Sequence, residues 1–366
     1  MSMRTWLAEP LPKAVASALE RLTTARGVLR VAVMPDVHLS DHVCVGTVVG
    51  TEGWLYPQAI GGDVGCGMAA VRLRADRSAL QDERAAELLL RHLHEAVPAL
   101  RRRRPYDGEL SLPLGAGLGS RLERTARIEF GTLGRGNHFL EVQADEHDGL
   151  WLMVHSGSRA VGPAIQDRWL ELAEPVGQGL RALAADSDAG REWRGDLDAA
   201  VDYAARNRRS IAESAAGALR EVGIDVDFTT WFDCAHNFVR LETHDGVPLW
   251  VHRKGACSAA DGERAIVPGS MGTRSYHVEG RGCAEAMASC SHGAGRRVAR
   301  GEAMRSIRVR DVERQMEGVF FDRSMTAALR DEAPSAYKDI GAVMRAQREL
   351  VRVVRTLRPV VAFKGG

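Results

Sequence analysis

The chain has 366 residues and a mass of 39.8 kDa, enough for one large domain or two ordinary ones. Hydrophobic residues make up 45% and charged residues 27%, which is typical of a globular enzyme with a sizeable core. The net charge of +1, from 49 basic and 48 acidic side chains, excludes a strongly basic protein that binds nucleic acid over its whole surface. A local basic groove would still need only a few Lys and Arg side chains.

Hydropathy and cysteine usage narrow the class of protein further. Apolar stretches are short, and none approaches the roughly 20 residues of a membrane span. Residues 1–13 lack the apolar core of a signal peptide. We therefore expect a cytoplasmic protein without a membrane association. The cysteines form no CxxC pair, so we expect no structural disulfides, and a special cysteine would be a metal ligand or a nucleophile. They are Cys44, Cys66, Cys234, Cys257, Cys283 and Cys290.

Apolar residues at helical spacing predict helices, and short apolar or β-branched runs predict strands. In chain order the expected elements are a helix over 12–24, strands over 29–34 and 67–73, a helix over 78–97, a strand over 150–155, helices over 164–185 and 196–222, strands over 238–241 and 249–251, and a helix over 340–357. The polar interval 184–198 is expected to be a loop or hairpin. The chain contains no internal repeat and no segment typical of an interdomain linker.

Glycines cluster with His, Asp, Asn and Ser in several of the connecting loops, and the chain holds 38 glycines. The clusters are residues 46–67, 131–137, 155–162, 255–282 and 292–295. Such loops can adopt positive φ and bring backbone amides close to anions. This pattern predicts irregular loops that converge on a polar site from rigid elements. The run Arg101–Arg104 is expected to be solvated rather than a specific phosphate contact.

Candidate metal ligands come from four of these loops. A glycine-rich turn places Asp63 and Cys66 three residues apart, so both side chains can face one centre. His138, His155 and His236 each lie beside small or amide residues instead of on an apolar helix face. A mixed Asp/Cys/His set suits Mn²⁺, Zn²⁺ or Fe²⁺, and a thiolate can bridge two ions. Taken singly, each residue is more often structural, so spacing alone leaves the metal site as a hypothesis.

Two further loops suit a phosphate. Val267–Gly272 offers backbone amides and the hydroxyl of Ser270. Ser289–Arg296 precedes residues that could begin a helix, where free N–H groups favour an anion. His292 in this loop is well placed to attack phosphorus, but the local sequence leaves three roles open: nucleophile, general acid/base and metal ligand. Among the remaining histidines, His38 is distinctive because it lies at a predicted transition from strand to loop, where active-site residues often lie.

Taken in order, these segments resemble the RtcB family of RNA ligases. The matching stretches are Met34–His38, Gly61–Met68, Gly131–Glu141, His155–Arg159, Cys234–Phe238, Arg253–Ala256, Pro268–Gly272, Ser289–Gly295, Asp331–Asp339 and Lys364–Gly365. The resemblance covers the chain from residue 30 onwards, and so many ordered motifs do not match by chance.

The resemblance implies one compact mixed α/β domain over residues 1–366, with buried β-sheets, surrounding helices and a deep metal-lined cleft. A doubly wound P-loop fold is excluded because the chain lacks G-x-x-x-x-G-K-[ST]. The implied activity is a GTP- and Mn²⁺-dependent RNA ligase that joins a 3′-phosphate or 2′,3′-cyclic phosphate end to a 5′-hydroxyl end. His292 would carry GMP, pass it to the RNA 3′-phosphate, and the 5′-hydroxyl would then displace it. An archease-type activator is a further partner that the family implies.

The resemblance also implies roles for single residues. Two Mn²⁺ ions would be held by Asp63, Cys66, His138, His155 and His236, with Cys66 bridging them. The guanylate would contact Asn137, Glu141, Ser270, Ser275, Gly293, Ala294, Gly295, Tyr337 and Lys364. Glu141 suits guanine because one carboxylate can accept from both N1–H and N2–H₂. Arg159 would hold a phosphate as a fork, and Asp36 is similar to the family's candidate base for the 5′-hydroxyl.

Two departures from the family pattern favour a specialised RNA-repair paralogue over an enzyme of routine tRNA splicing. Ser40–His42 replaces a small stretch with glycine and a basic residue, and the chain is short between Leu93 and Ile128. One alternative is an enzyme that caps 3′-phosphate ends with GMP without sealing them. Another is a catalytically silent RNA-binding paralogue, which would predict the loss of His292 or of a metal ligand. Neither is lost.

Overall fold

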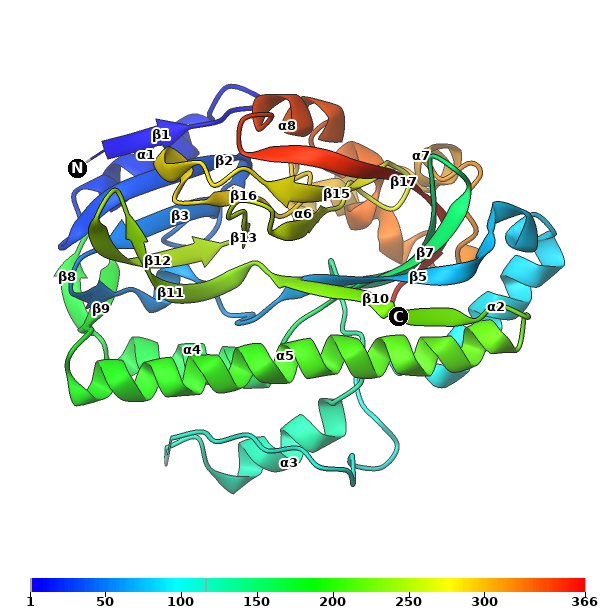
Figure 1. Ribbon diagram of the computed structural model, residues 1–366, viewed down its shortest axis with the longest axis horizontal. Coiled ribbons are helices and arrows are strands. Elements are labelled where there is room, and N and C mark those ends of the chain that lie inside the picture. Colours follow the sequence, from blue (N-terminus) through cyan, green and yellow to red (C-terminus); the bar gives the residue numbers. More distant parts are fainter. Residues whose placement is uncertain (1, 116, 366) are drawn as a thin grey trace.

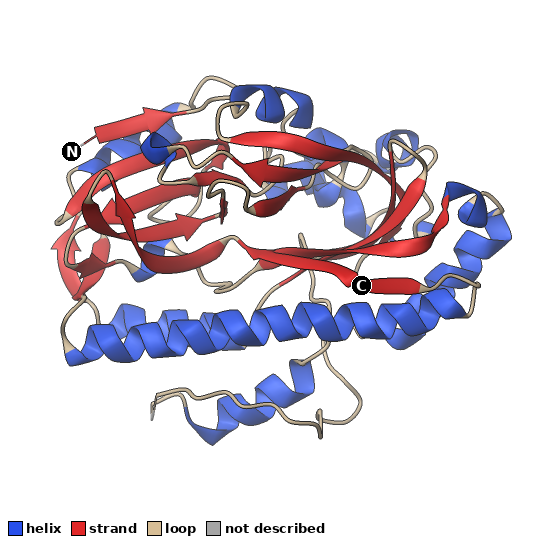
Figure 2. Ribbon diagram, in the orientation of Figure 1, coloured by secondary structure: helices blue, strands red, loops and turns tan. Residues whose placement is uncertain are grey.

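Two β-sheets form the centre of the molecule, and helices surround them (Figures 1 and 2). The computed structural model describes residues 2–115 and 117–365. In spatial order the first sheet contains β1 (Ser2–Thr5), β2 (Val28–His38), β3 (Val45–Thr51), β12 (Val247–Lys254) and β11 (Asn237–His244). The second contains β10 (Val226–Ala235), β5 (Gly67–Asp76), β7 (Gly149–Ser156), β6 (Phe139–Asp145), β17 (Val351–Phe363), β15 (Ser275–Gly280) and β14 (Arg264–Val267).

The sheets bring distant parts of the chain together at one place. In the seven-stranded sheet, antiparallel pairing puts Met68 on one side of His155 and Phe139 on the other. A two-stranded sheet of β13 (Ala256–Ser258) and β16 (Ser289–Ser291) then brings the His292 loop beside these strands. A second small sheet contains β4 (Trp54–Leu55), β9 (Leu180–Ala184) and β8 (Glu174–Gly177).

The longest helix, α5, runs beneath both sheets (Figure 1). It contains 33 residues, and at 1.5 Å per residue it is about 50 Å long. Ser187 begins it by accepting a hydrogen bond from the amide of Gly190. No helix of the described residues is long and apolar enough to cross a membrane. The helices are α1 (Lys13–Thr23), α2 (Glu83–Ala96), α3 (Gly119–Glu129), α4 (Val161–Leu172), α5 (Asp188–Arg220), α6 (Arg300–Ser306), α7 (Val309–Gln315) and α8 (Ile340–Ala346).

The structure confirms the mixed α/β class and most of the predicted elements. All five predicted strands are present as parts of β2, β5, β7, β11 and β12. The helix predicted over 12–24 is α1, and the one over 78–97 contains α2 after a short 3₁₀ turn. The helix predicted over 196–222 begins earlier, at Asp188, so the interval 184–198 is largely helical instead of a loop.

Two predicted helices were wrong in their second halves. The segment 164–185 is helical only to Leu172, because Pro175 cannot continue a helix and Gly177 and Gly179 turn the chain into a hairpin. The segment 340–357 is helical only to Ala346, and β17 begins at Val351. That strand is rich in β-branched residues, which favour strands over helices.

Candidate active site

The turn before β5 carries the first two candidate ligands. The amide of Cys66 donates to the carbonyl of Asp63 over 3.1 Å, which closes the turn and directs both side chains to one side. Gly65 within it has a φ of 70°, and a Cβ there would lie 2.8 Å from the backbone of Val201 in α5. Only glycine therefore fits this turn against the helix.

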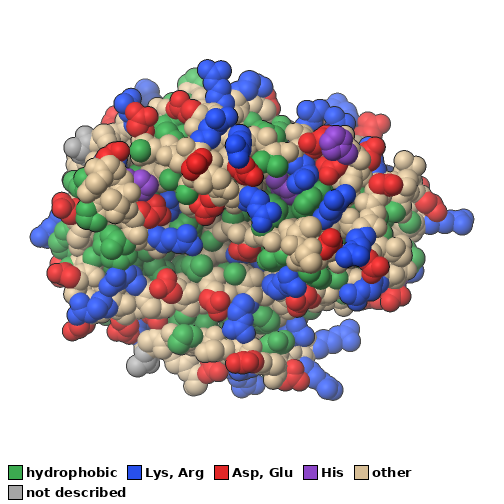
Figure 3. All heavy atoms as spheres, in the orientation of Figure 1, with side chains coloured by type: hydrophobic (Ala, Val, Ile, Leu, Met, Phe, Trp, Pro, Cys, Tyr) green, Lys and Arg blue, Asp and Glu red, His purple; other side chains and the backbone are tan. Residues whose placement is uncertain are grey.

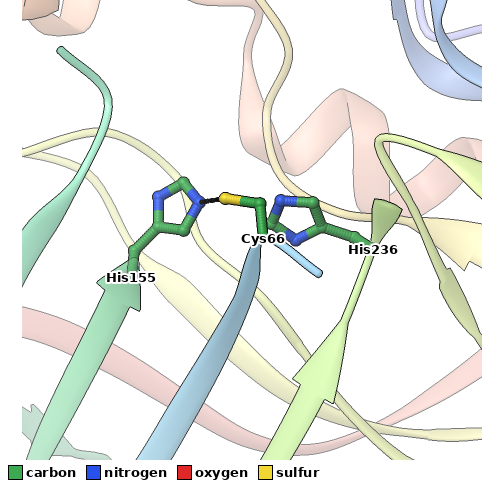
Figure 4. Close-up of side chains that lie close together, drawn as sticks. All are labelled: Cys66, His155 and His236. Atoms are coloured by element: carbon green, nitrogen blue, oxygen red, sulfur yellow. Dashed lines mark hydrogen bonds between the residues drawn. The ribbon is translucent and has the colours of Figure 1, made fainter. Parts of the chain in front are cut away.

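Five side chains predicted as ligands meet at this turn in two groups. Cys66, His155 and His236 form one group, and Asp63, Cys66 and His138 form the other. Within each group the candidate donor atoms lie within 4.8 Å of one another. Figure 4 shows the first group, in which the Cys66 sulfur lies between the two imidazoles, 3.2 Å from Nε2 of His155. Because Cys66 belongs to both groups, its sulfur can bridge two ions.

Backbone carbonyls determine the tautomers of two of these histidines. Nδ1 of His138 lies 3.0 Å from the carbonyl oxygen of Leu133, and Nδ1 of His155 lies 2.9 Å from that of Asn137. A carbonyl oxygen only accepts, so each Nδ1 carries the proton and each Nε2 keeps its lone pair. Burial also lowers the pKa of His155 and of His236 well below the usual range, which keeps both neutral. Neutral imidazoles oriented in this way are suited to bind a metal.

The side chains around Cys66 fit a cation for a second reason. In the tautomer just derived, the lone pair of His138 Nε2 faces the Asp63 carboxylate over 3.0 Å with no proton between them. Burial, and then the charge of Asp63, raise the pKa of the Cys66 thiol well above its usual range. His236 Nδ1 is buried and has no hydrogen-bond partner among the described residues. A divalent cation would relieve all three conditions.

Among the described residues, His292 lies beside this centre but belongs to neither group of candidate ligands. Its ring centroid lies 4.7 Å from that of His236. The Asp36 carboxylate accepts from His292 Nδ1 over 2.6 Å and from its backbone amide over 3.1 Å. Nδ1 therefore carries the proton, and Nε2 keeps a lone pair. Gly295 permits this approach, since it has a φ of 73° and a Cβ there would lie 2.2 Å from the Asp36 carbonyl oxygen.

A cavity of about 340 Å³ contains the candidate centre. Asp36 itself is fully buried behind His292, and His138 lies behind Asp63 and Cys66. The predicted residues that line the cavity are Asp63, Cys66, Asn137, Glu141, His155, His236, Ser270, Ser275, His292, Gly293, Ala294, Gly295, Tyr337 and Lys364.

Each large sheet contributes one wall to the cavity. The seven-strand wall consists of Phe139, Glu141, Ser275 and Lys364, which lie on or directly after β6, β15 and β17. The five-strand wall consists of His38, Val45, Lys254 and Gly255, which lie on or directly after β2, β3 and β12.

The seven-strand wall places a protonated carboxyl group in the cavity. Burial raises the pKa of Glu141 to about 8, against the hydrogen bond from Gln143 and the charge of Lys364, which both lower it. Gln143 Nε2 donates to Glu141 over 2.6 Å and to the Ser275 hydroxyl over 3.1 Å. This arrangement fixes the position of the carboxyl group and leaves its protonation dependent on what binds.

Glu332 supports the same end of the cavity, and sequence reasoning did not single it out. It accepts from Lys364 Nζ over 2.7 Å and from the Tyr337 hydroxyl over 2.7 Å. Its other oxygen contacts Arg296 and Arg300. Burial alone would raise the pKa of Glu332, but the cations outweigh burial and lower it. Its motif, Asp331–Asp339, was recognised, yet only a structure places the carboxylate among cations from three other segments.

On the five-strand wall, fewer of the described charged side chains are paired with an opposite charge than on the seven-strand wall. Lys254 is largely buried, and burial lowers its pKa to about 8. Its Nζ donates to the carbonyl of Asp41 over 3.4 Å, so the divergent loop Ser40–His42 contacts this wall. His38 is also part of the wall, and burial lowers its pKa to about 4.

A pair of residues on α5 holds the ligand loops from below, and both were missed. Asn207 accepts from the amide of Gly131 over 2.7 Å and donates to the hydroxyl of Ser156 over 3.0 Å. Arg208 donates to the carbonyls of Gly65 and Ser156 and pairs with Asp233. Two polar residues on the apolar face of a helix are the signal that could have identified them.

Arg159 lies outside the described residues that line the cavity. Its Nε donates to the Thr132 hydroxyl over 3.2 Å, behind His138. Its role on a phosphate stays a prediction. The run Arg101–Arg104 lies in the irregular segment between α2 and α3, and three of its four side chains are exposed. Acidic and basic side chains are also mixed over the face shown in Figure 3.

Comparisons with known proteins agree on one family. A family model described as tRNA-splicing ligase RtcB matches residues 18–116 and 107–365. An RNA-splicing ligase RtcB1 from Escherichia coli ATCC 25922 is 38% identical over 370 residues, which covers 92% of this chain and 90% of that protein. An RNA-splicing ligase RtcB from E. coli K12 is 37% identical over the same shares. A tRNA-splicing ligase RtcB from Archaeoglobus fulgidus is 30% identical, covering 91% of this chain and 87% of its own.

Proposed function

The chain belongs to the tRNA-splicing ligase RtcB family, and from this premise we propose that it is a GTP- and Mn²⁺-dependent ligase that joins RNA 3′-phosphate or 2′,3′-cyclic phosphate ends to 5′-hydroxyl ends. The family and the names of its members make the chain an RNA ligase. The observation that carries the finer proposal is the Asp36–His292 pair. The hydrogen bond leaves the lone pair of His292 Nε2 free, and His292 belongs to neither of the two described groups of candidate ligands beside it.

His292 Nε2 attacks the α-phosphorus of GTP, and pyrophosphate leaves. Asp36 keeps the proton on His292 Nδ1 and stabilises the positive charge that develops on the ring when the N–P bond forms. Glu141 lines the cavity and, once ionised, accepts hydrogen bonds from N1–H and N2–H₂ of guanine. Adenine has no such pair of adjacent donors. The RNA 3′-phosphate then takes GMP from His292, and the 5′-hydroxyl displaces it.

Asp63, Cys66, His138, His155 and His236 would hold the manganese ions. Bound there, the ions would neutralise negative charge on the phosphates that react beside His292. The chemistry of the ligands supports this assignment, because neutral imidazoles, a carboxylate and a thiolate together suit a borderline divalent ion better than Mg²⁺.

The proposal is tested by incubating the full chain with Mn²⁺ and GTP labelled at the α-phosphate. We expect an acid-labile label on the wild type and none on His292→Ala. His147→Ala is the matched control, because His147 is an exposed histidine in the turn between β6 and β7. A wild type without label would overturn the proposal and favour a silent RNA-binding paralogue, whereas label on His292→Ala would reassign the nucleophile.

A second assay separates sealing from capping. The wild type receives GTP, Mn²⁺ and RNAs that end in a 3′-phosphate and a 5′-hydroxyl. We expect a sealed 3′,5′-phosphodiester. Accumulation of an RNA capped by GMP at its 3′-phosphate, without any sealed product, would establish the capping alternative instead.

A further inference from the structure

His38 lies two residues after Asp36 on β2, and its imidazole lines the cavity. Asp36 is fully buried, and its Oδ2 is occupied by two donors from His292. The carboxylate predicted as the base for the 5′-hydroxyl is therefore behind the nucleophile, out of contact with the cavity. His38 is the titratable side chain that the same strand presents to the cavity itself.

Hydrogen bonding defines which nitrogen of His38 is available. Its Nδ1 lies 2.9 Å from the backbone carbonyl oxygen of Asp36, so Nδ1 carries the proton. Its Nε2 has no hydrogen-bond partner within residues 2–115 and 117–365, and it is not enclosed by protein. The charged and titratable groups that face His38 are His292, Asp36 and Lys338. Burial keeps the imidazole neutral, so Nε2 is left as a hydrogen-bond acceptor on a side chain that lines the cavity.

His38 and the residues proposed for the guanylate lie on different walls of the cavity, so the RNA 5′-hydroxyl end has room beside His38. Of the residues proposed for the guanylate, Glu141, Ser275 and Lys364 lie on the seven-strand wall, whereas His38 belongs to the five-strand wall. His292 lies close to both large sheets, since its ring contacts His236, which directly follows β10, and lies next to Gly255, which directly follows β12. A guanylate on the seven-strand wall would thus leave the His38 side free for the RNA end that attacks last.

We propose that Nε2 of His38 accepts the hydrogen bond of the incoming RNA 5′-hydroxyl and takes its proton during sealing. This rests on the proposed function. In that step, O5′ forms a bond to the phosphorus of the RNA 3′-phosphate, and the bond from that phosphorus to the bridging oxygen of GMP breaks. GMP leaves with the electron pair, and His38 holds the proton until it passes to solvent. His38 is then a catalytic residue of the last step, and Asp36 a positioning residue of the first.

The test isolates the last step by supplying RNA already capped with GMP at its 3′-phosphate, together with a 5′-hydroxyl RNA and Mn²⁺. His38→Asn keeps a donor for the Asp36 carbonyl but lacks the acceptor that reaches the cavity. We expect its sealing rate to fall by roughly 10²-fold or more, the usual contribution of a positioned base. Labelling of His292 by GTP should stay within about twofold of the wild type, because that step needs no base at His38.

His38→Gln refines the result, since its amide oxygen can accept the hydrogen bond but cannot take the proton. We expect its KM for the 5′-hydroxyl RNA to stay near the wild-type value while kcat falls as in His38→Asn. His42→Asn is the control, because His42 is exposed in the next loop and has a φ of 47°, which asparagine tolerates. It should seal normally.

Two outcomes would overturn the proposal. One is sealing by His38→Asn at the wild-type rate. The other is a parallel loss of labelling and sealing in both His38 variants, which would mean that His38 only supports His292. A wild type that neither labels nor seals would instead be a failure of the proposed function, so the two failures are distinguishable.

Discussion

The two walls of the cavity differ in how their charges are arranged. On the seven-strand wall, Lys364 is paired with Glu332, and Glu141 is held by Gln143. On the five-strand wall, Lys254 donates to a carbonyl oxygen over 3.4 Å, and His38 lines the cavity without an acidic partner among the described residues at its Nε2. A prearranged network suits one invariant ligand such as a guanylate. An open wall suits RNA ends of varied sequence, which are recognised by a hydroxyl group and not by a base.

The largest effect should come from Cys66, which both ligand groups share. Cys66→Ser should reduce labelling by more than about 10⁴-fold, because each metal supplies several kcal/mol of charge stabilisation. Manganese binding, measured by calorimetry, should weaken for both ions. His155→Ala should weaken the binding of only one of the two ions, because His155 belongs to only one group. Equal loss of both ions in His155→Ala would show that the two groups are not separate sites.

Asp36→Asn should produce the next largest effect. The amide loses the charge that stabilises the ring and can favour the wrong tautomer of His292, so labelling should fall by about 10³- to 10⁴-fold. The measurement is the single-turnover labelling rate, with Asp41→Asn as an exposed control from the adjacent loop. Sealing of capped RNA should fall much less. An equal loss of labelling and of sealing would show that Asp36 is needed in both steps.

Arg208→Met should affect stability more than specificity. Arg208 is fully buried, and its loss leaves Asp233 unpaired and two carbonyl groups without a donor. Breaking such a pair lowers the free energy of unfolding by about 3–5 kcal/mol. Urea unfolding measures this, with Arg220→Met as the control, because that exposed pair at the end of α5 should contribute less than about 0.5 kcal/mol. Similar stability of both variants would contradict the role of α5.

Glu141 should make GTP binding depend on pH. Guanine needs the ionised carboxylate, but the pKa of about 8 keeps the empty site mostly protonated at neutral pH. Binding therefore releases a proton, and affinity should rise by about tenfold per pH unit up to pH 8 and then level off. Calorimetry between pH 6 and about 9 would measure this. In Glu141→Gln the affinity should be lower and independent of pH; a persisting slope would assign the proton to another group.

The smallest effect is expected from the arginines outside both walls. Arg103 and Arg104 are exposed in the segment before α3. Replacing both with alanine should change sealing by less than about twofold at physiological salt, because exposed charges are screened. A salt-dependent loss of RNA affinity would show instead that the RNA extends onto this segment.

The structure brings most of the residues that the motifs predicted for the site to one cavity, whereas periodicity misassigned parts of two helices. The role of each site residue stays a prediction. Asp63, Cys66, His138 and His236 lie in turns or between strands, where glycine and polar residues have few structural explanations, so their types were informative. His155 lies near the end of β7. The strand β17 was missed because the spacing of apolar residues in 340–357 fits both a helix and a half-buried strand. Glu332 could not be assigned from sequence, because its partners come from other elements. Asn207 and Arg208 could have been identified as polar residues on an apolar helix face, but the sequence does not show which loops they hold.

The helix α5 has a consequence for how the molecule moves. Loops that carry ligands are usually among the first segments to open. Here Asn207 and Arg208 attach the loops at Gly65, Gly131 and Ser156 to the middle of a helix of 33 residues. Hydrogen exchange at the amide of Gly131, which is bonded to Asn207, should therefore be as slow as in the centre of α5. The irregular parts of the site would then open only when the whole molecule unfolds.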